Sequence, residues 1–372
     1  MPIKNGVPTG IRTPVTAVKG RDNILIYIDY LFLCAKIVLI SVLFVGCGVQ
    51  TETLEAGCHT SPLHQASVPP INGYEGTWVK NPDPFIWVSD SGFDSGYTST
   101  PRVVFDDQTN TYRTYYTGGV LIDQPGREMF GVAISQTPSG ATAKYNGSGD
   151  RSSLFHLGLP GSYDYDRQWG FGTIIKDGVW KMWTIGDSDG TAAHTASVGY
   201  ATSQDGLTWG KHYANTPTGA VFEDMECGGE SRGVLRFAVL KDTDGYYAFY
   251  TTFHSGVIKL AFSEDGENGW RVLGGINSPA VSWVGNVLKD GEIYYLTATK
   301  PDHTGVVILA SVDKVNWVQY DELNISPEYP WQSAVMNYPF LFKDTSGWYL
   351  YYTAADLVTD GWRERIGVAV LR

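Results

Sequence analysis

One pattern recurs five times along the chain: a pair of aromatic or apolar residues followed by threonine. Each copy ends a segment that runs from an apolar stretch through a polar turn into a second apolar stretch. Strand, turn and strand in this order are typical of a β-hairpin. We call the five residues the anchor threonines: Thr117, Thr184, Thr251, Thr297 and Thr353.

A third short segment follows each hairpin after a variable loop: GVAIS, GYATS, KLAFS, ILAS and GVAVL. In the middle three units this segment leads into a turn that ends in Trp. Five units of four short antiparallel strands, without helical periodicity, predict an all-β fold, the five-bladed β-propeller. A β-sandwich is the alternative, but it gives no reason for the same threonine-anchored hairpin to recur five times.

The composition fits this fold and limits the classes of molecule that the protein could bind. Apolar residues make up 43% of the chain and aromatic residues 13%, enough for a core, whereas charged residues make up only 18%. The formal net charge of -12 argues against binding to nucleic acid or an anionic membrane surface, because no basic cluster neutralises phosphates. We expect a monomer whose partner is a neutral or sugar-like ligand.

The first 75 residues differ from the rest. The apolar run IVLISVLFVG stands directly before Cys47, which is how a bacterial lipoprotein signal reads. A transmembrane anchor is the alternative, although a spanning helix needs about 20 apolar residues. The earlier stretch GIRTPVTAVKGR resembles a translated transfer-RNA gene. We therefore expect a mis-called start and signal in 1–47, a tether in 48–75 and a propeller catalytic domain in 76–372, exported and held at the cell envelope by lipid alone.

Acidic residues precede the first three hairpins. In a propeller, the segment before each hairpin and the segment after each anchor threonine share one face. Asp94, Asp164, Asp166 and Glu230 lie between 18 and 23 residues before their anchors, and Glu226 lies beside Glu230 in MECGGESRGV. Blades 1, 2 and 3 would each bring an acid to this face. A solvated acidic loop is the alternative for the Glu226 stretch.

Three sequence segments resemble those of a known protein family: WVKNPDPF, STPRVVFDD with YRTYYTGG, and GYATSQDGLTW. Over residues 76–372 the chain resembles the five-bladed glycoside hydrolases of families 43 and 32 and related predicted glycosylases. The resemblance implies an Asp in blade 1 as base or nucleophile, a supporting Asp in blade 2 and a Glu in blade 3 as general acid. The matching positions here are Asp83 or Asp94, Asp164 or Asp166, and Glu230 or Glu226.

The chain also departs from these families. Family 43 carries its blade 1 Asp before Pro at the strand, whereas the Asp-Pro here, Asp83-Pro84, lies well ahead of Thr100-Pro101. Family 32 has Arg-Asp-Pro in blade 2, where this chain has Asp166-Arg167 without the Pro. Glu226-Cys227 resembles the Glu-Cys pair of family 32. A non-catalytic propeller that binds glycan or protein therefore stays open beside a glycosidase.

Cleavage of a glycosidic bond needs one protonated carboxyl and one carboxylate, and no cofactor. Histidines after the anchors could bind sugar hydroxyls or a structural calcium at the axis, as in some family 43 members, or be ordinary loop residues. Tryptophans near strand starts could stack on sugar rings or pack in the core. The candidates for substrate binding are Arg232, His194, His254, His303, Trp169, Trp283 and Trp331.

The lipid anchor gives the first prediction. If Cys47 carries lipid, the chain expressed with its own signal should fractionate with membranes, and Cys47→Ala should release it or block its processing. Fractionation and immunoblotting check this outcome. A cleaved Cys47→Ala product that stays with membranes as firmly as the wild type contradicts it.

Overall fold

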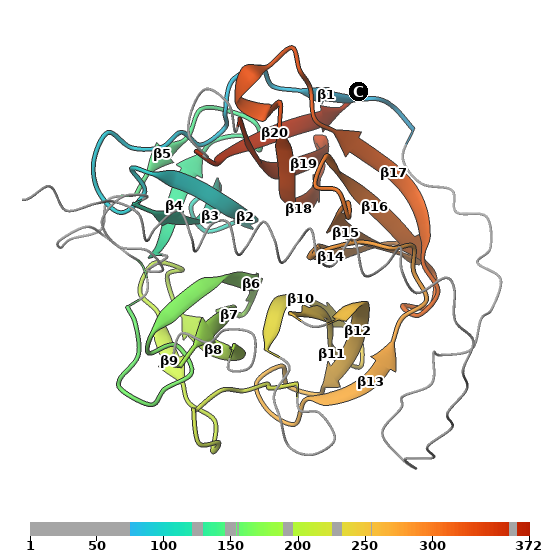
Figure 1. Cartoon of the computed structure of the whole chain (residues 1–372). Coiled ribbons are helices and arrows are strands. Elements are labelled where there is room, and N and C mark those ends of the chain that lie inside the picture. The colour runs from blue at the N-terminus through green and yellow to red at the C-terminus, as the bar shows by residue number, and fades with distance from the viewer. Residues whose placement is uncertain are drawn as a thin grey trace, which may run out of the picture. The chain divides into compact units, whose positions relative to one another are not determined.

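The computed structural model describes residues 75–120, 129–145, 154, 156–188, 196–224, 233–253, 255–356 and 363–372. Its strands form five sheets of four antiparallel strands each. The five sheets surround one axis, with β2, β6, β10, β14 and β18 nearest to it (Figure 1). This confirms the five-bladed β-propeller predicted from the repeated hairpins.

The first four blades follow the chain in order. Blade 1 holds β2 (Tyr97–Asp106), β3 (Thr111–Gly119), β4 (Met129–Ser135) and β5 (Ala143–Lys144). Blade 2 holds β6 (Arg167–Asp177), β7 (Val179–Asp187), β8 (Ser197–Ser203) and β9 (Gly210–His212). Blade 3 holds β10 (Val234–Asp242), β11 (Gly245–Thr252), β12 (Ser255–Ser263) and β13 (Arg271–Gly275). Blade 4 holds β14 (Val284–Asp290), β15 (Ile293–Thr299), β16 (Gly305–Ser311) and β17 (Val318–Asn324).

Blade 5 is built from both ends of the described chain. It holds β18 (Val335–Asp344), β19 (Gly347–Ala355) and β20 (Arg365–Leu371), and its outermost strand is β1 (Trp78–Lys80). A short 3₁₀ helix, η1 (Pro330–Gln332), precedes β18. The repeated segments supply only three strands of this blade, and pairing of Trp78 with Leu371 adds the fourth. Pairing the two ends closes the ring of blades.

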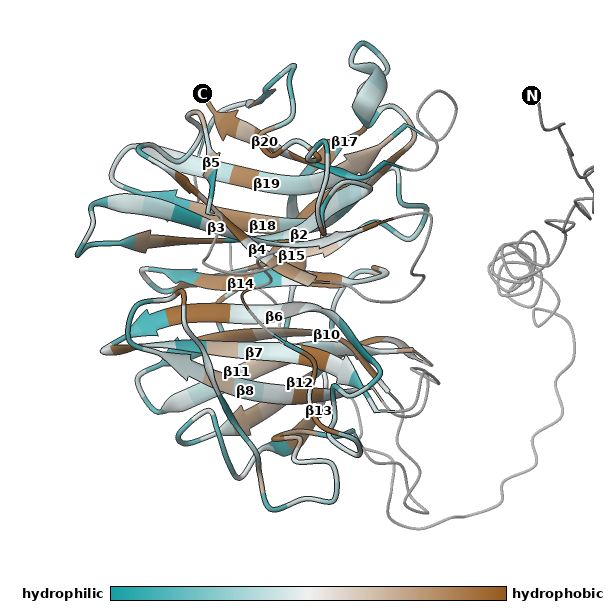
Figure 2. Ribbon diagram, turned by 90° about the vertical axis from the view of Figure 1, so that its left-hand side faces the viewer, coloured by the Kyte–Doolittle hydropathy of each residue, from teal (hydrophilic) through white to brown (hydrophobic). Residues whose placement is uncertain are grey.

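Apolar side chains pack between the blades. The buried clusters of the described chain each join two neighbouring blades, such as Phe237 of blade 3 with Trp183 of blade 2. Hydrophobic colour lies mainly on the strands, and the connecting loops are mostly hydrophilic (Figure 2). No helix in the described part of the chain has the length and apolar character needed to cross a membrane.

A break in strand register explains the anchor threonines. In blade 1, Ser99 pairs with Thr117 and pairing resumes at Arg102, so Thr100 lies in a bulge with a φ of 50°. The hydroxyl groups of Thr100 and Thr117 are hydrogen-bonded. Each of the other blades has a bulge in its innermost strand beside its own anchor threonine. The recurrence of the threonine thus reflects a bulge that bends each innermost strand where it begins.

Ion pairs join the innermost strands at their other end. Four of these strands end in Lys-Asp, and each Lys reaches the Asp that ends the preceding innermost strand. The pairs are Lys176–Asp106 at 2.8 Å, Lys241–Asp177 at 2.5 Å, Lys289–Asp242 at 3.0 Å and Lys343–Asp290 at 2.5 Å. Between blades 5 and 1, the Tyr112 hydroxyl instead donates to Asp344 at 2.6 Å. We call this set the lysine–aspartate ring.

Asp106 is a buried member of this ring, with 1% of its side chain exposed. Burial alone would raise the pKa of Asp106, but hydrogen bonds from Lys176 and Thr109 and the attraction of Arg113 lower it to about 2. The carboxylate therefore stabilises the fold at pH values above the ordinary Asp pKa. This stabilisation is lost as the pH falls from about 4 towards 2.

We predict that Asp106→Asn lowers the free energy of unfolding at pH 7 by about 2–4 kcal/mol, because it leaves Arg113 and Lys176 without their shared carboxylate. Asp107→Asn is the matched control, since its side chain is 74% exposed and also contacts Lys176. Denaturant unfolding at pH 7 and at pH 2.5 measures both variants. Equal losses from the two variants, or a difference that persists undiminished at the lower pH, contradict the ion-pair argument.

Candidate functional site

Three side chains from three blades meet where the innermost strands begin, a surface that we call the N-terminal face. Ser99 comes from β2, Arg236 from β10 and Glu364 from the residues just before β20. The Ser99 side chain hydrogen-bonds Glu364, and Arg236 attracts the same carboxyl group. The Thr98 amide donates to the Glu364 backbone oxygen at 2.9 Å, which fixes the position of the residue against blade 1.

Glu364 has an unusual proton affinity. Burial raises the pKa of its carboxyl group to about 7, while the Ser99 hydrogen bond and the positive charge of Arg236 act in the opposite direction. The residue nevertheless keeps partial exposure to solvent. A carboxyl group with these properties exchanges protons near neutral pH, as a general acid must.

An aromatic cluster lies beside these three side chains. The Trp283 and Tyr338 rings stack with their centroids 5.3 Å apart and an interplanar angle of 9°. The His303 ring packs edge-on against Trp283, with the ring centroids 4.5 Å apart. The Arg236 guanidinium lies 4.5 Å from the Tyr338 ring centroid and 5.4 Å from that of Trp283. Asn337 contacts His303 Nδ1 at 2.7 Å. Of the residues predicted from sequence, Trp283 and His303 are therefore brought together here.

Asp94 and Asp164 are buried and paired with lysines. Asp94 accepts hydrogen bonds from Lys144 at 2.6 Å and from the Tyr116 hydroxyl at 2.8 Å. Asp164 pairs with Lys211 of the outermost strand β9 in the same way. These contacts give both carboxylates a structural role, and a catalytic role for Asp94 stays a prediction.

Blade 5 repeats this arrangement with an uncharged residue. Buried Gln332 accepts a hydrogen bond from the Tyr352 hydroxyl at 2.9 Å, as Asp94 does from Tyr116. The Trp331 ring stacks 6.3 Å from the Tyr352 ring and its Nε1 donates to Pro82 O at 2.7 Å. Trp331 thus packs against blade 5, and its role in substrate binding stays a prediction.

Three further predicted residues lie at the surface or near it. Asp83 is exposed between β1 and Ile86. The Asp166 side chain is 44% exposed and lies 3.4 Å from Arg167. Trp169 is half-buried, with the Arg167 guanidinium 4.9 Å from its ring. The other predicted residues lie outside the described residues, and their roles stay predictions: Cys47, His194, Glu226, Glu230, Arg232 and His254.

The sequence did not identify Arg236 and Glu364. Arg236 stands inside an innermost strand, at its bulge, whereas the sequence pattern pointed to the segments before these strands. An arginine within the otherwise apolar stretch VLRFAVL was the available signal. Glu364 precedes β20, the third strand of blade 5, and the start of this strand lies at the N-terminal face.

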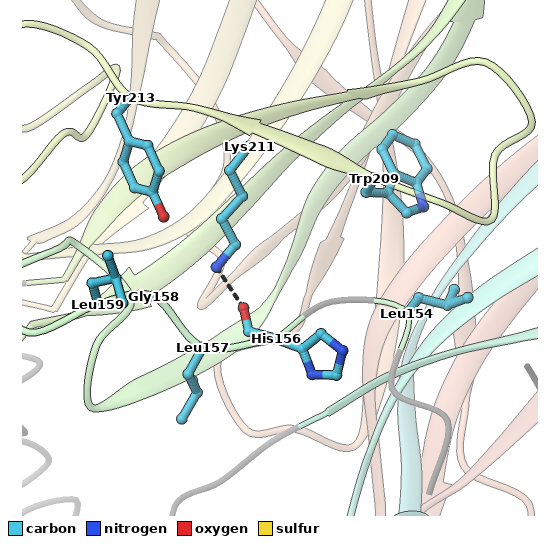
Figure 3. A pocket seen from close by; sticks show the side chains of 8 residues that line it. All are labelled: Leu154, His156, Leu157, Gly158, Leu159, Trp209, Lys211 and Tyr213. Atoms are coloured by element: carbon cyan, nitrogen blue, oxygen red, sulfur yellow. Dashed lines mark hydrogen bonds between the residues drawn. The ribbon is translucent and has the colours of Figure 1, made fainter. Parts of the chain in front are cut away.

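A cavity of about 250 Å³ lies on the outer side of blade 2. Residues of the 154–159 segment and of the region around β9 line it, including Trp209 and Tyr213 (Figure 3). The Lys211 Nζ points across it to the His156 backbone oxygen, and it also binds Asp164. Lys211 thus fixes the wall of this cavity to the core of blade 2.

Within the described residues, no group of three His, Cys, Asp or Glu side chains is arranged to hold a metal ion. Calcium at the axis stays a prediction and enters none of the chemistry below. His303 contacts Asn337 and Trp283.

Comparisons with known proteins agree with this architecture. No family model and no curated protein matches the chain. Among solved structures, it is similar to BT0996 in its complex with RGII (TM-score 0.59, 17% identity, covering 79% of this protein and 92% of that one). It is also similar to CoXyl43, a GH43 β-xylosidase/α-arabinofuranosidase from a compost microbial metagenome, in a calcium-free complex with xylotriose (TM-score 0.55, 13% identity, covering 80% of this protein and 96% of that one). A third similar structure is the GH43_1 enzyme from Xanthomonas citri complexed with xylotriose (TM-score 0.54, 13% identity, covering 79% of this protein and 90% of that one).

At these identities the likeness concerns the fold. The chain therefore has the five-bladed fold of GH43 glycoside hydrolases, as the sequence resemblance indicated.

The geometry of Asp94 gives a prediction of its own. Asp94→Asn should lower Tm by several degrees, since loss of a buried charge pair destabilises by a few kcal/mol, while kcat on any substrate found changes little. Ser95→Ala is the control, because Ser95 is the adjacent residue and is less buried. Thermal melts and steady-state kinetics decide the matter. A large fall in kcat at unchanged Tm would assign Asp94 the catalytic role predicted from the sequence.

Proposed function

We propose that this protein hydrolyses glycosidic bonds of an oligosaccharide or polysaccharide at the N-terminal face of the propeller. One observation carries the proposal: the Glu364 carboxyl, with a pKa near neutrality, lies beside Arg236 and an aromatic cluster. The fold shared with glycoside hydrolases supports it, as do the saccharides in similar structures, xylotriose among them.

The chemistry requires two carboxyl groups on opposite sides of the sugar. One donates a proton to the leaving oxygen, and the other acts as base or nucleophile. Glu364 holds a proton near pH 7, and the Ser99 hydrogen bond orients it. The sequence assigns the acid to Glu230, with Glu226 beside it, and offers Asp83 or Asp94 of blade 1 as base or nucleophile. Asp164 or Asp166 of blade 2 would be the supporting carboxylate. Glu364 and Glu230 are thus rival candidates for the general acid.

A glycan-binding propeller without activity is the second candidate. Thr100 stands before Pro101, where the resembled family carries its carboxylate, and its hydroxyl bonds Thr117. Asp94 and Asp164 are held by lysines. If no other carboxylate faces Glu364 across the sugar, the same surface would bind saccharide without cleaving it. In either case we place the protein at the cell envelope, attached through Cys47.

The test compares Glu364→Gln with Glu230→Gln. For the true acid, the exchange should lower the rate on a natural oligosaccharide by ~10²- to 10⁴-fold and on an aryl glycoside far less, because an aryl leaving group needs little protonation. Because the acid acts in its protonated form, wild-type activity should fall as the pH rises through about 7, and Glu364→Gln should remove this limb of the profile.

Glu292→Gln is the matched control, because Glu292 is exposed in the turn between β14 and β15 at the other end of the propeller. Wild-type kinetics from Glu364→Gln, together with the selective loss from Glu230→Gln, would move the acid role to Glu230. Binding of glycans without turnover of any glycoside in a broad panel would favour the non-catalytic propeller.

A further inference from the structure

Arg236 is a buried arginine with an unsatisfied donor. Only 7% of the residue is exposed, and its Nη1 donates to its neighbour's backbone oxygen, Leu235 O, at 2.7 Å. Its Nε is buried and has no hydrogen-bond partner among the described residues. A buried guanidinium donor that stays unpaired in a folded protein is uncommon, and a missing ion or ligand is one physical explanation.

Among the described residues, no carboxylate forms a hydrogen bond or an ion pair with Arg236. Tyr338 and Trp283 offer ring faces and no carboxylate. Arg102 is also buried, and burial lowers the pKa of its guanidinium group. The charge of nearby Arg236 lowers this pKa further. No hydrogen bond or ion pair joins Arg236 to Glu364 in the described structure, and burial favours the uncharged form of that carboxyl group. Two buried guanidinium groups, those of Arg102 and Arg236, therefore lie close together in this part of the described structure.

We propose that Arg236 binds the carboxylate of an acidic sugar, so that the saccharide taken by this face contains uronic acid. A guanidinium group presents parallel donors that match a planar carboxylate, and the adjoining Trp283 and Tyr338 rings suit the apolar face of a sugar ring. The assignment deepens the proposed function by naming its substrate class. As a statement about binding, it holds whether or not the bond is cleaved.

Binding to wild-type protein measured by isothermal titration calorimetry tests the proposal. The probes are a digalacturonate, the neutral galactose disaccharide of the same linkage and a sulfated galactose disaccharide. A charge-assisted pair predicts that the wild type binds the uronate ~10- to 100-fold more tightly than the neutral sugar. Equal affinity for the two, or tighter binding of the sulfated sugar, overturns the proposal.

The variants identify the residue. Arg236→Met should abolish the preference for uronate. Arg236→Lys keeps the charge without the planar fork, so it should fold and retain only part of the preference. Arg271→Met, in the outermost strand of blade 3, is the matched control and should behave as the wild type. An undiminished preference in Arg236→Lys and Arg236→Met contradicts the assignment; circular dichroism verifies that each variant is folded.

This experiment separates the two proposals. Hydrolysis of neutral glycosides without a preference for uronate refutes the uronate site and leaves the proposed function standing. A uronate preference that depends on Arg236, in a protein that cleaves none of the saccharides, supports the site and refutes the hydrolase.

Discussion

The lysine–aspartate ring sets the frame on which the rest of this propeller depends. Neighbouring blades share no backbone hydrogen-bond ladder in the described structure, so they are held by apolar packing and by side chains that cross between innermost strands. Each lysine of the ring reaches the blade before its own, which fixes the innermost strands to one another at the ends where they finish. Pairing of β1 with β20 then closes the circle.

The opposite ends of the same strands are irregular. Bulges beside the anchor threonines bend the innermost strands where they begin, and two inserted residues, Thr100 and Tyr338, adopt a φ of 50°. Bulges are common beside functional sites because they redirect side chains that a regular strand would keep alternating. Arg236 lies at such a bulge, and its charge acts on the carboxyl group of Glu364, which belongs to another blade.

Burial divides the acidic residues into two groups. Asp94 and Asp164 are buried, and each pairs with a lysine whose positive charge balances its own. Glu364 has a serine hydroxyl and a more distant guanidinium, which do not offset its desolvation. The pKa of Glu364 therefore rises, and the acid least evident in the sequence is the one whose environment suits proton transfer.

The sequence by itself determined the fold, because a threonine-anchored hairpin repeated five times reports local strand, turn and bulge chemistry. It also located Trp283 and His303, which flank strands at the N-terminal face. It could not identify the fourth strand of blade 5, whose partner lies at the far end of the chain. Nor could it distinguish Asp94 from Glu364, because the neighbours of each carboxyl group come from other strands and blades. Lys144 and Arg236 are such neighbours, and only the tertiary structure brings them to their carboxyl groups.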